Sequence, residues 1–146
     1  MSQALRLFFV CAFIAMLTTG CYTLSTVRFG NGTTAKVKVR SSQTGQEIEV
    51  APARFEKLPH ACGDLIVTTT NGQRFRFSGI DPPRVDGSSG GYLERRSSIF
   101  GPGYITLSLL LGANSELHAL LPGKKTVESA VPQPDDYPKT GQRMAD

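Results

Sequence analysis

Short segments in which hydrophobic and polar residues alternate constrain the fold of this chain more than any other feature. In residues 35–40, Ala35, Val37 and Val39 fall on one side of an extended backbone and three cations fall on the other. Successive side chains of a β-strand point to opposite faces of the sheet, so this alternation predicts a strand with one buried face. Residues 23–78 show no helical periodicity.

Similar segments recur at intervals of about 8–12 residues, with Gly, Asn and Pro between them. The predicted strands are residues 23–29, 35–40, 47–50, 54–58, 65–70, 74–78, 104–111 and 117–121. Asn71-Gly72 predicts a tight hairpin, because a type I′ turn needs positive φ at both central positions. About seven or eight short strands predict an all-β fold, either an antiparallel β-sandwich or a small barrel.

Two of the predicted strands carry opposite charges. If residues 35–40 pair antiparallel with residues 47–50, Glu47 and Glu49 lie on the same outer face as the three cations. These cations are Lys36, Lys38 and Arg40. We therefore expect the charges on this face to neutralise one another locally.

The connection formed by residues 80–103 interrupts the strand pattern. A connection this long inside a compact domain is usually functional or disordered. Its middle contains Tyr92, Leu93, Ile99 and Phe100, which argue against complete disorder. The residues that we expect to form a contact surface are Tyr92, Leu93, Arg95, Arg96 and Phe100. One turn of helix is expected around residues 93–97.

The N-terminal segment predicts export. Its only charged side chain, Arg6, precedes an apolar run over residues 7–17 and then small residues. These are the properties of a secretory signal peptide. The run is too short for a membrane-spanning helix, which needs about 20 apolar residues.

Residues 17–21, Leu-Thr-Thr-Gly-Cys, resemble the lipobox of bacterial lipoproteins. The resemblance covers only residues 1–22. It implies attachment of diacylglycerol to Cys21, cleavage between Gly20 and Cys21, and acylation of the new amino group. Two or three acyl chains, at about 0.8 kcal/mol per buried methylene, hold a protein firmly to a bilayer. Because Tyr22 stands where inner-membrane lipoproteins carry Asp, the resemblance favours the periplasmic face of the outer membrane.

Domain boundaries follow from these signals. Residues 1–20 are predicted to be the signal peptide, and residues 21–126 a single β domain anchored to the membrane through Cys21. Residues 127–146 lack apolar periodicity and contain three prolines, which predicts a flexible tail. The formal net charge of +4 is too mild to predict a nucleic-acid partner.

One short stretch, His60-Ala61-Cys62, combines residues that could act together in chemistry. On an extended backbone, residues 60 and 62 point the same way, so they could form a redox pair or supply two metal ligands. A blue-copper site would need a second histidine, and the spacing to His118 does not match that pattern. Once Cys21 is lipidated, Cys62 has no partner for an intramolecular disulfide, and we expect it to be buried in the core.

Nothing else in the sequence predicts catalysis. Residues 87–91 are rich in glycine but lack the Lys-Ser/Thr of a phosphate-binding loop, and the carboxylates of the long connection have no fixed spacing. We therefore expect a protein without enzymatic activity and without a cofactor.

The leading hypothesis from the sequence is a lipid-anchored envelope protein with a structural or protein-interaction role, in contact with an envelope protein or with peptidoglycan through residues 80–103. A second hypothesis is a glycan- or lipid-binding module that uses its cations. A third is a redox or metal-binding protein that depends on His60 and Cys62.

Overall fold

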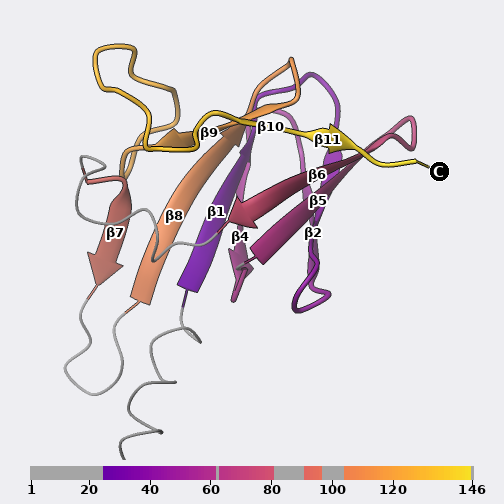
Figure 1. Cartoon of the computed structure of the whole chain (residues 1–146), viewed down its shortest axis with the longest axis horizontal. Helices are drawn as coiled ribbons and strands as arrows, with labels where there is room; N and C mark the ends of the chain where they lie inside the picture. Colours follow the sequence, from indigo (N-terminus) through magenta and orange to yellow (C-terminus); the bar gives the residue numbers. More distant parts are fainter. Residues whose placement is uncertain (1–24, 62, 81–90, 97–103, 146) are drawn as a thin grey trace, which may run out of the picture.

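The structure is a computed structural model of the 146-residue chain and describes residues 25–61, 63–80, 91–96 and 104–145. These residues form eleven strands in two sheets that pack face to face as a β-sandwich (Figure 1). The predicted all-β class is confirmed. The described residues contain no helix with the length and apolar character needed to cross a membrane.

The first sheet has six strands. Their order is β10 (Lys139–Thr140), β9 (Glu116–Leu120), β8 (Tyr104–Leu111), β1 (Ser25–Asn31) and β4 (Phe55–Pro59), and β7 (Leu93–Arg96) pairs with β8. Strands β7 and β9 divide one edge of β8 between them, because β7 pairs with its first half and β9 with its second half. The pairing of β1 with β8 is parallel, and the other pairings described in both sheets are antiparallel.

The second sheet has five strands. Their order is β11 (Gln142–Arg143), β6 (Arg74–Ile80), β5 (Gly63–Thr69), β2 (Val37–Ser41) and β3 (Glu47–Val50). The predicted alternation is confirmed in β2, whose valines are buried and whose cations are exposed. Strands β10 and β11 belong to one continuous segment, so the C-terminal chain crosses from the first sheet to the second and closes one side of the sandwich.

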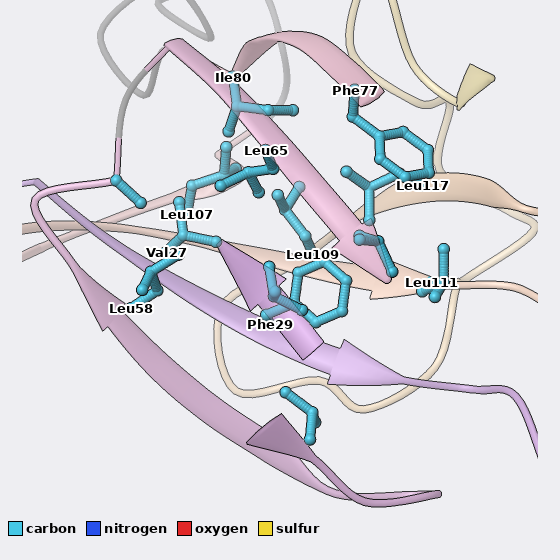
Figure 2. Packing of buried hydrophobic residues seen from close by; sticks show 14 of the residues in the cluster. Val27, Phe29, Leu58, Leu65, Phe77, Ile80, Leu107, Leu109, Leu111 and Leu117 are labelled. Atoms are coloured by element: carbon cyan, nitrogen blue, oxygen red, sulfur yellow. The ribbon is translucent and has the colours of Figure 1, made fainter. Parts of the chain in front are cut away.

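The hydrophobic core lies between the two sheets. Its largest fully buried side chains include Phe29 from β1, Leu107 and Leu109 from β8, and Leu65 and Phe77 from the second sheet (Figure 2). Burying a side chain of this size contributes about 1.5–3 kcal/mol.

Asn31 organises the connection from the first sheet to the second. Its side chain is fully buried, and its amide nitrogen donates to the carbonyl oxygens of Ala35 at 2.8 Å and Val50 at 2.9 Å. Its amide oxygen accepts from the backbone nitrogen and the hydroxyl of Thr33. A buried amide that is fully hydrogen-bonded in this way fixes the path of the chain.

The hairpin between β5 and β6 differs in detail from the prediction. Gly72 has a positive φ of 83°, but the φ of Asn71 is not positive, so the predicted two-residue type I′ turn is wrong. The backbone nitrogen of Thr69 donates to the carbonyl of Gln73, which leaves a three-residue loop ending in a left-handed glycine. The Asn71 side chain stabilises this loop by accepting from the backbone nitrogen of Gln73.

Two further sequence expectations are wrong. Residues 93–96 form strand β7 and not a helical turn, because β8 offers them an open edge from Tyr104 to Leu107. Residues 127–145 are not a free tail, because they supply β10 and β11, and Val131 and Tyr137 pack against the core. The Gln133 amide also exchanges two hydrogen bonds with the backbone of Ala119, at 2.8 and 3.0 Å, and so caps the edge of β9.

Candidate functional site

The predicted contact residues divide into a buried part and an exposed part. Tyr92 is only 3% exposed, and its hydroxyl donates to the carbonyl of Pro132 at 2.9 Å. Burial raises the pKa of this hydroxyl, with a smaller contribution from the Glu128 carboxylate. Leu93 packs against the core. The prediction that Tyr92 forms part of a contact surface is therefore wrong, because this side chain ties the start of β7 to the segment after β9.

The exposed part consists of Arg95 and Arg96. Together with the exposed Tyr104, which the structure adds, they form what we name the strand-end surface. Arg96 lies directly opposite Tyr104 in the pairing of β7 with β8. The Arg96 side chain is 78% exposed, and its Nε donates to the Glu94 carboxylate at 2.8 Å. Tyr104 is 53% exposed. Phe100, the remaining predicted contact residue, lies outside the described residues.

Tyr104 was not among the contact residues predicted from the sequence. The alternation of residues 104–111 could have indicated it, because Tyr104 falls on the same outward-facing side of the predicted strand as Thr106 and Ser108. An aromatic ring on the outward-facing side of a strand indicates either that this face is covered by another part of the protein or that the ring is exposed and available for contact. The structure places it at the beginning of β8, where the sheet ends.

The strand-end surface lies where the folded domain begins. Ser25, the first residue of β1, pairs with Ile105, the residue after Tyr104. Strand β4 ends at the same end of the sheet, since Pro59 pairs with Thr26. Figure 1 shows β1 and β8 starting and β7 ending side by side at this end.

The other predicted site residues do not assemble into a described centre. His60 is exposed, with a φ of 53°, just after the end of β4. His118 lies opposite Leu110, toward the other end of the first sheet. Cys21, Gly20 and Cys62 lie outside the described residues. Within the described ranges, no group of three or more His, Cys, Asp and Glu residues is arranged to hold a metal ion.

The outer face of the second sheet carries the cations predicted from the alternation of β2. The Nζ atom of Lys36 lies 2.7 Å from a carboxylate oxygen of Glu49, and that of Lys38 lies 3.8 Å from one of Glu47. The predicted local neutralisation is therefore confirmed for these two cations. The hydrogen bond and the positive charge of Lys36 lower the pKa of Glu49. Both pairs are about half exposed, and such surface pairs contribute little to stability.

A groove of about 290 Å³ lies between exposed residues of β6 and the C-terminal segment, which pairs with the edge of β6 through β11. We name it the C-terminal groove. Its lining residues are Arg76, Ser78, Asp136, Pro138, Lys139, Thr140 and Gln142. The Nε atom of Arg76 forms an ion pair with a carboxylate oxygen of Asp64 at 2.9 Å. The Lys139 ammonium lies 5.1 Å from the centroid of the Tyr137 ring. The sequence alone could not reveal this groove, because most of its lining comes from residues expected to be flexible.

No protein-family model, curated protein or solved structure matches this chain.

Proposed function

We propose that the chain is a lipid-anchored bacterial envelope protein, located at the periplasmic face of the outer membrane, with a non-enzymatic structural or protein-interaction role. The observation that carries the proposal is the lipobox-like sequence ending at Cys21, followed almost immediately by the first strand at Ser25. A sandwich tethered this closely can act only on molecules near the bilayer surface.

The described part of the long connection supports a role in contact. Strand β7 is held by the pairing with β8, by the buried Tyr92 and by the partly buried Leu93, so Arg95 and Arg96 are presented on a fixed backbone. Arginine side chains on a rigid element suit recognition of carboxylates on an envelope protein or on peptidoglycan.

Metabolic labelling with a fatty-acid analogue tests the anchor. Labelling of the wild-type chain and its loss in Cys21→Ala are expected, together with an acyl mass on a mature chain that starts at Cys21. An unlabelled wild-type chain that is recovered in the soluble fraction would overturn the proposal. The Tyr22→Asp variant in an enteric host should move the protein from outer to inner membrane fractions.

A pull-down from solubilised membranes tests the contact surface. Deleting β7 would also remove the buried Tyr92, so point changes are required. The Arg95→Glu, Arg96→Glu double variant should lose partners that the wild type retains. A matched control, Arg54→Glu with Lys125→Glu, reverses two exposed cations elsewhere and should keep them. Identical partners for both double variants would count against the strand-end surface.

A second candidate function is glycan binding in the C-terminal groove. The specific observation is the lining itself, which comes mostly from residues that carry hydroxyl, amide, cationic or carboxylate groups. Such groups suit a saccharide that carries an acidic substituent, although the volume lies at the lower end for ligand sites. Titration with soluble peptidoglycan fragments should shift NMR signals of Thr140 and Gln142. Lys139→Ala should abolish these shifts and the control Lys125→Ala should not.

A further inference from the structure

We propose that the strand-end surface rests on the lipid headgroups of the membrane that anchors the chain, so that the sandwich stands on the bilayer with β1 rising from it. This inference rests on the proposed lipidation of Cys21. It adds an orientation and a protein–lipid contact that the anchor alone does not specify.

The length of the tether supports this orientation. Cys21 and Ser25 are separated by four residue steps, which span at most about 14 Å even when fully extended. The acyl chains start at Cys21, so the first residue of β1 cannot move farther than this from the anchored residue. The end of the sandwich where β1 begins is therefore held beside the headgroups.

The strand-end surface lies at that same end. Ser25 pairs with Ile105, and Tyr104 precedes Ile105 and lies opposite Arg96. Neighbouring strands are about 4.8 Å apart, so one strand spacing separates β1 from Tyr104 and two separate it from β7. The tether thus brings these side chains to the membrane surface without any rearrangement of the fold.

The chemistry of these residues fits a membrane interface. Tyrosine combines an apolar ring with a polar hydroxyl and is enriched at the headgroup level of membranes. Arginine is attracted to anionic headgroups within a Debye length of the surface. Since the Glu94 carboxylate forms an ion pair with Arg96 and offsets its charge, we infer that the ring of Tyr104 makes the main contact.

The exposure of Tyr104 singles it out. Among the described residues, the large hydrophobic side chains that are exposed are Tyr104 and Val127, at 53% and 39%. Val127 belongs to the segment between β9 and β10, which lies away from the end where β1 begins (Figure 1). The two positions therefore form a matched pair, one expected at the membrane and one expected in water.

The chain contains no tryptophan, so a single substitution creates a unique fluorescent probe. The full lipidated protein would be prepared as Tyr104→Trp and as Val127→Trp. Each variant would be reconstituted in vesicles of phosphatidylethanolamine and phosphatidylglycerol, with and without acyl-chain-brominated phosphatidylcholine. The acyl mass on Cys21 would be verified in every sample. Circular dichroism would confirm that both variants are folded.

We expect the indole of Tyr104→Trp to shift its emission to shorter wavelength and to lose most of its intensity in brominated vesicles. The indole of Val127→Trp should keep the emission of a water-exposed probe. Replacing phosphatidylglycerol by a zwitterionic lipid should weaken the quenching only slightly.

Equal emission and equal quenching for the two variants, with the acyl mass present, would overturn the inference and leave the proposed function standing. A shorter emission wavelength for Tyr104→Trp without bromine quenching would also overturn it, since a protein partner or a second copy would then cover the ring. Absence of the acyl mass would overturn the proposed function, and the inference with it.

Discussion

The ring of Phe55 fills the space that a side chain at Gly30, its direct partner across β1 and β4, would occupy. The guanidinium carbon of Arg28 lies 4.0 Å from the centroid of the same ring. Glycine in a strand interior is intrinsically unfavourable, and an aromatic ring laid over it compensates by burying the bare backbone. This pair covers the outer face of the first sheet close to its edge.

We expect Gly30→Ala to destabilise the domain by about 1–3 kcal/mol, because the added methyl group forces the Phe55 ring away from both the backbone and Arg28. The free energy of unfolding can be measured by urea denaturation. In a Phe55→Ala background, Gly30→Ala should cost much less, since the clash is gone. Equal costs in the two backgrounds would contradict the close packing.

Asn31→Ala should destabilise the protein by about 2–4 kcal/mol, because the buried carbonyl of Val50 and the partly buried groups of Ala35 and Thr33 lose their hydrogen bonds together. Thermal unfolding followed by circular dichroism checks this. Asn31→Asp offers a sharper test, since it places a carboxylate against the carbonyl oxygens of Ala35 and Val50. Burial raises the pKa of such a carboxylate, so the added instability should be smallest in acid and should grow as the pH rises. A pH-independent loss would argue against this contact.

Tyr137→Phe should stabilise the domain by about 1 kcal/mol at neutral pH. The Tyr137 hydroxyl is buried without a hydrogen-bond partner among the described residues, and an unmet buried donor is costly. Burial, and to a smaller extent the charge of Asp136, raises the pKa of this hydroxyl well above its ordinary value. The folded state therefore keeps this hydroxyl protonated at a pH at which the unfolded state, with a pKa of about 10, already loses the proton. The free energy of unfolding of the wild type is unaffected below that pKa and decreases as the pH rises above it. Wild type should lose more stability than Tyr137→Phe in alkaline urea titrations, and the opposite order would refute the assignment.

Gly141→Val should detach the C-terminal segment. A Cβ atom at Gly141 would lie 2.8 Å from Cζ of the buried Phe77 and 3.2 Å from Cβ of Phe75, and neither position leaves room for it. Amide hydrogen exchange should accelerate in β10 and β11, and limited proteolysis should cut before Lys139. Ala145→Val, at an exposed position beyond β11, serves as the control and should behave as wild type. Unchanged protection in Gly141→Val would mean that this segment is not closely packed.

The strands that the sequence predicted well are those whose side chains carry their own signal. Strand β3 has the predicted bounds because Glu-Ile-Glu-Val alternates cleanly, and the antiparallel pairing of β2 with β3 follows from the charges on their outer faces. Such patterns are local, and a single strand displays them whether or not its neighbour is known.

The features that the sequence did not reveal depend on distant parts of the chain. Strand β7, Leu-Glu-Arg-Arg, does not alternate and exists because β8 leaves half of one edge open. The C-terminal segment is ordered by backbone pairing with β6 and β9, which leaves no hydrophobic period in its own residues. From the sequence alone, Tyr92 was expected on the surface, because its hydrogen-bond partner, the carbonyl of Pro132, lies forty positions later in the chain.

The parallel pairing of β1 with β8 also determines the order in which the domain can form. Ser25 can pair with Ile105 only after roughly eighty further residues have been synthesised, so the pairing of the first strand is completed only when one of the last strands is present. Topologies dominated by such distant contacts assemble slowly. If the chain is exported as proposed above, β1 cannot complete its pairing until β8 has also crossed the membrane, so the segment that precedes β1 stays accessible to processing enzymes until then.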